Sequence, residues 1–214
     1  MTIWFASGNI HKKKELAAIL SSRGITCELK SPADAGLIFE PDETGNSFLE
    51  NALIKARELC QLLEKQGPGG GTNGNLIIAD DSGICVDALG GWPGIHSARY
   101  CGPGKTSDTK LSDAERNSLL LAELGDNPLR SARFVCAMVL YFSPGRFFAA
   151  QETLEGELLP HGEAARGDKG FGYDPILLIP GLNRTVAELS DEEKNRLSHR
   201  GKAGRAIAHI LAGA

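Results

Sequence analysis

The start of the chain carries the pattern that most narrows the choice of fold. Residues 2–9 read TIWFASGN, an apolar run that ends in small polar residues and is typical of a short buried strand. Residues 11–24 then place apolar side chains on one helical face and end in glycine, and residues 25–29 are a second candidate strand. A strand, a short polar turn, a helix and another strand form the βαβ unit of an α/β protein.

The rest of the chain extends this pattern and predicts a mixed sheet. Helical periodicity predicts helices at 47–65, at 111–124 and from about 198, and apolar runs predict strands at 76–81, 133–142, 146–158 and 175–179. Capping boxes, Ser47 with Glu50 and Ser112 with Glu115, mark the starts of the first two of these helices. The two long strands flank Ser143-Pro144-Gly145 and are predicted to form a hairpin, so the sheet would be mixed rather than wholly parallel.

Composition and charge exclude several classes of protein. The 214 residues are 42% hydrophobic and 23% charged, with no internal repeat and no linker. We therefore expect one domain over residues 1–214, at most divided into two closely packed lobes that are not independent domains. A net charge of −4 argues against binding to polymeric nucleic acid, which usually needs a basic surface.

Cysteine usage and hydropathy bear on where the protein works. Its five cysteines are widely spaced, with no Cys-x-x-Cys pair, which disfavours a zinc site or a disulfide framework and fits a reducing cytosol. The N-terminal apolar stretch is too short for a signal peptide, and no apolar run approaches the roughly 20 residues of a transmembrane helix. We therefore expect a cytoplasmic protein without a membrane partner.

Two glycine-rich stretches resemble nucleotide-binding motifs but lack the context that those motifs need. Residues 69–74 read GGGTNG, with a predicted helix before them and a strand after them, the reverse of a dinucleotide-binding turn. Residues 101–106 read CGPGKT, but Arg99 stands where a P-loop needs its first glycine. We interpret the first stretch as a surface loop and reject the second as a P-loop.

The turn after the first strand has the features of an anion site. Residues 7–12 read SGNIHK, and lysines follow at a helix start, where the helix dipole normally favours acidic residues. A phosphate bound by backbone N–H groups, Ser7, Asn9 and Lys12 would account for those lysines. An ordinary capped helix with solvated lysines is the alternative.

Acidic residues elsewhere suit a divalent cation. Asp80 and Asp81 come at the predicted end of a buried strand, where adjacent carboxylates either form a solvated turn or hold a cation. Mg²⁺ prefers such oxygens, and one aspartate would hold the ion while its neighbour deprotonates a water. Glu43, before the long helix, and Lys55, within it, are ambiguous by themselves because they also fit a loop acid and a solvated lysine.

The stretch GDKGFGYDP, residues 167–175, is the last candidate. Glycines around its two aromatic residues suit an aromatic face exposed to a flat ligand. Lys194, His199 and Arg200 downstream would supply phosphate charge or hydrogen bonds to a base edge. A glycine-rich turn before an ordinary basic helix is the alternative. Acidic residues for a metal, basic residues for phosphates and an aromatic face for a base together indicate an enzyme that processes nucleotide phosphates.

Six sequence motifs narrow the choice among enzymes that process nucleotide phosphates. In order, they read ASGNIHKKKEL, TGNSFLENALIKA, IADDSGICVDALGGWPGIHSARY, ARFVCAMVL, GFGYDPIL and AELSDEEKNRLSHRGKA, and they span nearly the whole chain. Together they resemble the motifs of the Ham1-like family, the inosine triphosphate or noncanonical purine nucleoside triphosphate pyrophosphatases. The resemblance implies an α/β fold of two lobes around a long mixed sheet with flanking helices, with the active site in the cleft between the lobes.

The resemblance also implies an activity and an assembly. Members of the family hydrolyse ITP, dITP and XTP between the α and β phosphates, giving the nucleoside monophosphate and pyrophosphate and cleansing the nucleotide pool. It further implies Mg²⁺ as cofactor and a homodimer.

Carried over residue by residue, the resemblance assigns roles to individual side chains. Asp81 resembles the general base, and Glu43, Asp80 and Asp81 resemble the metal ligands. The substrate-binding set is Ser7, Gly8, Asn9, Ile10, His11, Lys12, Lys55, Ser82, Phe171, Gly172, Tyr173, Asp174, Lys194, His199 and Arg200. Which of the two aspartates holds metal and which carries the proton stays open.

A mechanism and its rivals follow from these assignments. Water would attack the α-phosphorus in line while Asp81 takes its proton. A donor such as Arg200 would bond the 6-carbonyl of hypoxanthine or xanthine and be left unpaired against adenine, which would give selectivity. The alternatives are a pyrophosphatase of pyrimidine triphosphates, a nucleotide sensor that does not cleave, and an inert scaffold that binds no nucleotide.

Overall fold

A computed structural model describes residues 1–65, 76–109 and 111–213 and confirms an α/β fold built on a mixed sheet. Its helices and strands are β1 (Thr2–Phe5), α1 (Ile10–Ser22), β2 (Glu28–Lys30), α2 (Phe48–Lys65), β3 (Leu76–Val86), α3 (Asp113–Leu124), β4 (Ser131–Ser143), β5 (Arg146–Leu158), β6 (Leu177–Ile179), β7 (Arg184–Thr185), α4 (Asp191–Leu197) and α5 (His199–Ala212). The sheet order is β2-β1-β3-β4-β5-β6-β7. Strand β1 runs parallel to β2 and β3, whereas β6 runs antiparallel to β5 and β7.

The chain divides into two compact units. The first unit comprises Met1–Asp81, Cys136–Glu152 and His199–Ala214, and the second comprises Ser82–Val135 and Thr153–Ser198. The unit boundaries at Asp81, Val135 and Glu152 fall inside β3, β4 and β5 respectively. Each unit is therefore assembled from segments that are distant in sequence.

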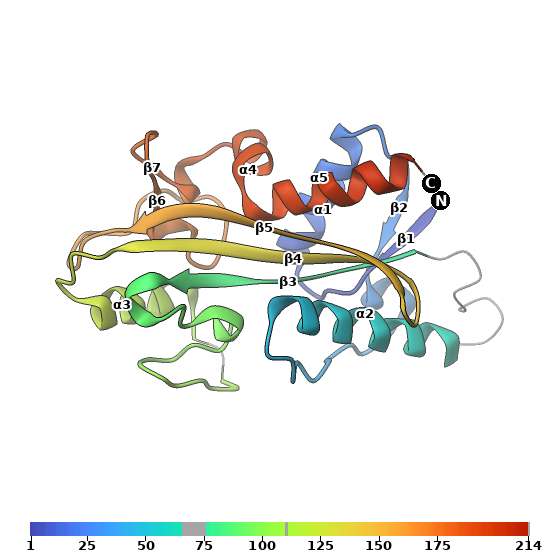
Figure 1. Cartoon of the computed structure of the whole chain (residues 1–214), viewed down its shortest axis with the longest axis horizontal. Coiled ribbons are helices and arrows are strands. Elements are labelled where there is room, and N and C mark those ends of the chain that lie inside the picture. Colours follow the sequence, from blue (N-terminus) through green and yellow to red (C-terminus); the bar gives the residue numbers. More distant parts are fainter. Residues whose placement is uncertain (66–75, 110, 214) are drawn as a thin grey trace. The chain divides into compact units, whose positions relative to one another are not determined.

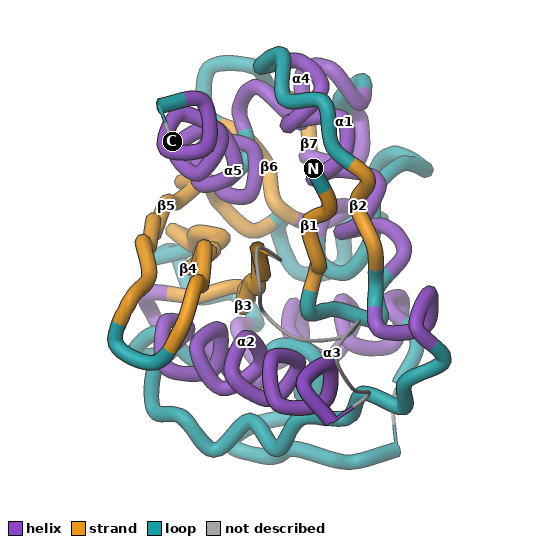
Figure 2. Tube along the Cα trace, turned by 90° about the vertical axis from the view of Figure 1, so that its right-hand side faces the viewer, coloured by secondary structure: helices purple, strands orange, loops and turns teal. Residues whose placement is uncertain are grey.

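In the first unit, helices cover both faces of the sheet. Figures 1 and 2 show α1 and α5 side by side on one face of β1, with α2 on the other. The cause is the alternation of side chains along each strand. Phe5 packs in one buried cluster with residues of α1 and α5, whereas its neighbour Trp4 packs in another with residues of α2.

The second unit has a core of its own. Ile84 of β3, Leu120 of α3 and Ile176 belong to one buried cluster, which also takes in residues of β4, β5 and β6. Helix α3 begins at the predicted capping box, because the Ser112 hydroxyl accepts the Glu115 N–H and the Glu115 carboxylate accepts the Ser112 N–H.

The helix starts and the hairpin test the sequence predictions in detail. The hairpin is confirmed, with β4 and β5 joined by Pro144 and Gly145. At α2 only half of the predicted box forms, since Ser47 accepts the Glu50 N–H while Glu50 accepts the N–H of Asn46. Strand β7 and helix α4 were not predicted.

Three further predictions concern loops and membranes. Residues 69–74 lie outside the described residues. Residues 101–106 lie in the loop before α3, and no helix begins there, in agreement with the rejection of a P-loop. None of the helices among the described residues is long and apolar enough to span a bilayer.

The prediction that the third strand ends at Asp81 is wrong, because β3 continues to Val86. Gly83, within this continuation, allows another segment to approach the strand closely. A Cβ added at Gly83 would collide with the Gly94 carbonyl oxygen and the Ser97 hydroxyl, and that hydroxyl accepts the N–H of Ile84 at 2.8 Å. The turn at Gly94–His96 and Ser97 therefore packs directly against the backbone of β3.

Gly83→Ala is expected to lower the free energy of unfolding by about 1–3 kcal/mol, since the added methyl group overpacks a site closed by backbone. Chemical denaturation measures the change. Gly8→Ala is the matched control for stability, because a Cβ at Gly8 meets nothing within 4 Å and the backbone there has an ordinary φ. Equal effects of the two substitutions would contradict the packing argument.

Candidate active site

The two adjacent aspartates of β3 point to opposite faces of the sheet. Successive side chains of a strand alternate. Asp80 lies two residues after Ile78 and so shares its face, on which Ile78 packs with α1 and α5. Asp81 lies two residues after Ala79 and shares the other face, on which Ala79 packs with α2. The two carboxylates are adjacent in sequence but pair with different cations, both within the first unit, and Lys55 links them because it also donates to the Asp80 carbonyl at 3.3 Å.

Asp80 lies in a buried network of ions. Lys12 of α1 approaches its carboxylate at 3.1 Å, and Nε of Arg200 in α5 donates to it at 3.1 Å. Nη1 of Arg200 donates to Glu15 at 2.6 Å. Burial alone would raise the pKa of Asp80, but the charges of Lys12 and Arg200 hold that pKa well below its usual range. The network explains how a strand can continue through a buried carboxylate.

Lys12 reaches this network because of the way α1 begins. Asn9 is the N-cap, and its side-chain oxygen accepts the N–H groups of His11 and Lys12 at 2.9 and 3.2 Å. Ser7 in turn accepts the Asn9 N–H at 3.2 Å. The first turn contains no acidic residue, and Gly8, Ile10 and His11 are exposed. The turn is thus an ordinary capped helix start that also presents a lysine and a helix N-terminus suited to an anion.

Asp81 belongs to the second cluster, on the α2 side. Lys55 of α2 donates to its carboxylate at 2.6 Å and lies 3.2 Å from Glu43. Burial alone would lower the pKa of Lys55, but the charges of Asp81 and Glu43 outweigh it and raise that pKa above its usual value. Lys55 is 8% exposed, so the alternative of a solvated lysine is wrong, and Glu43 is more than a loop acid.

Asn51 completes this cluster and was missed in the sequence. Its amide group donates to Asp81 at 3.4 Å, and its side-chain oxygen accepts the N–H of Gly45 at 2.9 Å. Asn51 thereby connects the loop that carries Glu43 to the carboxylate of Asp81. The available signal was a polar residue inside the apolar stripe of α2, where Asn51 is 1% exposed.

The two clusters differ in how well they fit Mg²⁺. Glu43 and Asp81 both face one cation, the Lys55 ammonium, and two carboxylates completed by water and phosphate oxygens are the usual ligand set of Mg²⁺. The Asp80 side chain is fully buried between Lys12 and Arg200 on the opposite face. Glu43 and Asp81 are therefore the two carboxylates that the structure brings to one cation, and the assignment of Asp80 as a further metal ligand stays a prediction. Across the described ranges, no three acidic, His or Cys side chains gather as a metal-binding group.

The paired state of Asp80 predicts a pH dependence. Because its pKa is lower in the folded state, its ion pairs stabilise the protein above the unfolded-state pKa of about 4, and this contribution is lost as the pH falls through the folded-state pKa. The difference in unfolding free energy between the parent and Asp80→Asn is expected to be constant from about pH 5 to 8 and to shrink below about pH 4. Urea titrations at several pH values measure it, and a difference that grows on acidification would contradict the assignment.

A further group of predicted binding residues lies in the second unit, around Asp174. The Asp174 carboxylate accepts the N–H of Phe171 at 2.8 Å and pairs with Lys194 at 2.7 Å. Lys194 also lies 4.6 Å from the centroid of the Phe171 ring. Gly170 has φ +75°, and a Cβ there would collide with Asp174. Phe171 is half-buried, so this loop presents one aromatic residue beside a buried cation.

Tyr173 does not form the exposed aromatic face that the sequence suggested. It is 4% exposed, packs in the core of the second unit, and donates its hydroxyl to the Ser97 carbonyl at 2.8 Å. Burial raises the pKa of Tyr173 above its usual value. The reason for the error is that flanking glycines are needed here for backbone conformation, with φ +64° at Gly172.

Three predicted residues remain. Ser82 is half-buried in β3, and His199 begins α5 and is 5% exposed. Arg200 is 1% exposed, with donors engaged by Asp80 and Glu15. Arg200 thus has a place in the buried network, and its role as a donor to the base stays a prediction.

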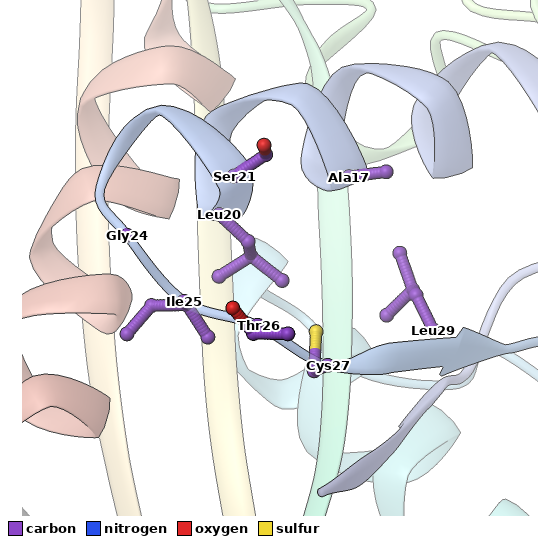
Figure 3. Close-up of a pocket in the computed structure, with 8 residues that line it drawn as sticks. All are labelled: Ala17, Leu20, Ser21, Gly24, Ile25, Thr26, Cys27 and Leu29. Carbon is purple, nitrogen blue, oxygen red and sulfur yellow. The ribbon is translucent and has the colours of Figure 1, made fainter.

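A separate hollow of about 260 Å³ lies against α1, away from both clusters. Figure 3 shows its lining of Ala17, Leu20 and Ser21 from α1, the turn after α1, and Leu29 of β2. None of the predicted site residues lines it.

Comparisons with known proteins agree with the fold and with the order of the motifs. The model of the Ham1 family matches residues 3–210. The "dITP/XTP pyrophosphatase" of Treponema denticola is 42% identical over 213 residues, covering 100% of both chains, and that of Bacillus subtilis is 37% identical over 209 residues, covering 96% of this chain and 94% of the relative.

Solved structures extend the agreement to three dimensions. The Ham1 protein of Staphylococcus aureus matches with a TM-score of 0.79 at 33% identity, covering 100% of this chain and 99% of that one. A HAM1 protein from Coxiella burnetii matches with a TM-score of 0.82 at 34% identity, with 100% of both chains covered. The chain therefore belongs to the Ham1 family.

Proposed function

We propose that this protein hydrolyses noncanonical purine nucleoside triphosphates, namely dITP, XTP and ITP, to the nucleoside monophosphate and pyrophosphate. The observation that carries the proposal is the cluster of the buried Lys55 and Asp81 with the half-buried Glu43, which combines two carboxylates with a lysine of raised pKa. Family membership and relatives named dITP/XTP pyrophosphatases support the choice of substrate.

The residues of the first unit divide into those that bind phosphate and those that act on water. Lys12, Lys55 and the start of α1 would neutralise phosphate charge. Asp81 is the better candidate for the general base, because Asp80 is fully buried between two cations whereas the Asp81 side chain retains 8% exposure. Glu43 and Asp81 would hold Mg²⁺, which when bound supplies Lewis-acid charge stabilisation to the phosphates.

The residues of the second unit would contact the base. Phe171 offers a half-buried ring, and Lys194 and Asp174 offer a charged donor and an acceptor beside it. Selectivity for the 6-carbonyl purines requires a hydrogen-bond donor at the base, and the buried Arg200 stays the proposed donor.

Product analysis tests the proposal directly. Purified protein with Mg²⁺ is incubated separately with dITP, XTP, ITP, ATP, GTP, dTTP and UTP, and pyrophosphate is resolved from orthophosphate. Pyrophosphate from the first three, little from the others, and loss of activity in a chelator are expected. Preferential turnover of dTTP or UTP would favour a pyrimidine pyrophosphatase, orthophosphate would mean a different bond is cleaved, and binding without product would favour a sensor.

We also infer that the protein is a homodimer in solution. Light scattering coupled to gel filtration tests this. A cytoplasmic location is supported by five free thiols, which suit a reducing compartment. Both units would fold as one domain, because the unit boundaries interrupt β3, β4 and β5, and a single cooperative unfolding transition is the expected observation.

A further inference from the structure

The backbone N–H and the backbone carbonyl of Gly172, next to Phe171, both bond to α3. The Gly172 N–H donates to the carboxylate of Asp113 at 2.6 Å, and the Gly172 carbonyl accepts from the side-chain amide of Asn117 at 3.1 Å. The two α3 residues lie one helical turn apart and so face the same side of the helix. This clamp joins chain segments 59 and 55 residues apart in sequence.

The hydrogen bonding of Asn117 indicates that this side chain serves to donate to the Gly172 carbonyl. A carbonyl accepts only, so the Asn117 group beside Gly172 must be its NH₂, and the side-chain oxygen must point elsewhere. Asn117 is 4% exposed, and its buried oxygen has no hydrogen-bond partner among the described residues. An apolar residue of similar size would avoid that unsatisfied group. The amide is therefore explained by what it gives to Gly172.

The residues on either side of the clamp show what it positions. Asp174 holds the N–H of Phe171, and the Tyr173 hydroxyl is anchored on Ser97. With Gly172 bonded to α3 as well, hydrogen bonds hold this loop at Phe171, at Gly172 and at the Tyr173 side chain, although Gly172 itself is the most adaptable of residues. The orientation of the half-buried Phe171 ring is set by this backbone.

We propose that Asn117 and Asp113 are positioning residues for recognition of the purine base, acting through the Gly172 peptide on Phe171. The inference rests on the proposed function. It differs from a purely structural role in one respect: loosening the clamp weakens binding of the base without weakening binding of the phosphates.

Steady-state kinetics with dITP, combined with inhibition by inorganic tripolyphosphate, tests this separation. Asn117→Leu, which keeps the side-chain volume, is expected to raise KM for dITP about tenfold, the typical effect of one lost buried hydrogen bond, with little change in kcat. Asp113→Ala should do the same, and Asp113→Asn, which keeps an acceptor for the Gly172 N–H, should restore most of the affinity. The inhibition constant of tripolyphosphate, which has no base, is expected to stay within about twofold of the parent value, a change too small to represent a lost contact.

A matched control and the contrary outcomes complete the design. Asn127→Ala removes an exposed amide beyond the end of α3, which bonds only its own turn at Leu129 among the described contacts, and should leave KM unchanged. Equal shifts for dITP and tripolyphosphate, or no shift for either, would overturn the inference. A parent protein that does not hydrolyse dITP would instead overturn the proposed function, and this inference with it. Because Asp113 is half-exposed, its variants keep the test available if Asn117→Leu does not fold.

Discussion

Asp81→Asn is expected to lower kcat for dITP by roughly 10³-fold while leaving the protein folded, within the range that loss of a general base usually produces. The substitution preserves the shape of the side chain, and its one amide oxygen can still accept from Lys55, although its NH₂ group can no longer accept from Asn51. What it removes is the negative charge that would accept a proton from water and contribute to an Mg²⁺ site with Glu43. Steady-state assays of pyrophosphate release measure the change.

Two further variants decide whether the effect belongs to Asp81. Asp87→Asn removes an exposed carboxylate just beyond β3 that pairs with Arg133, and it should leave kcat nearly unchanged. Asp80→Asn should instead lower stability first, because Asp80 is fully buried between Lys12 and Arg200. Retained turnover in Asp81→Asn, with its fold confirmed by circular dichroism, would show that another group accepts the proton.

Much of the fold could be predicted because its signals are local. The spacing of apolar residues marks α1, α2 and α3, and the Ser112–Glu115 box marks the start of α3 within four residues of sequence. The turn at Pro144 and Gly145 likewise lies between the strands that it joins. In each case the residues that determine the element also belong to it.

The errors concern side chains whose partners are distant in sequence. Asp80 was expected to end a strand, but its cations come from positions 68 and 120 residues away and neutralise it inside the sheet. Tyr173 was expected to be exposed, but the carbonyl that accepts its hydroxyl is 76 residues away. A sequence pattern indicates that burying a polar side chain would be unfavourable. It does not identify the distant residue that pairs with that side chain and makes its burial possible.

The sequence predicted which residues belong to the candidate site but not how they are arranged around one another. Glu43, Lys55 and Asp81 were each singled out, and the structure brings all three together. Alternation of side chains along β3 places Asp80 and Asp81 on opposite faces. This could be predicted only if the strand was known to continue past both residues. Asn51, Asn117 and Asp113 escaped notice because amides and helix-start acids are common in helices for ordinary reasons.

Arg200→Met is expected to lower the free energy of unfolding by about 3–5 kcal/mol, because it leaves buried carboxylates without their partner. Arg200 is 1% exposed and joins Asp80 to Glu15 through two different nitrogens. Burial alone would lower the pKa of Arg200, but the charges of Asp80 and Glu15 raise it above its usual value, so the guanidinium stays charged at any accessible pH. Methionine replaces most of the side-chain volume without the charge, so the loss reports the ion pairs.

A matched control and a double variant separate the ion pairs from packing. Arg205→Met, on the same helix but only half-buried, should change stability by less than about 1 kcal/mol. Combining Arg200→Met with Asp80→Asn removes both members of one pair, and the loss should be smaller than the sum of the single losses by about 1–3 kcal/mol. Additive losses would mean that Asp80 and Arg200 act independently, and that Lys12 and Lys55 account for the ability of β3 to carry a buried carboxylate through the sheet.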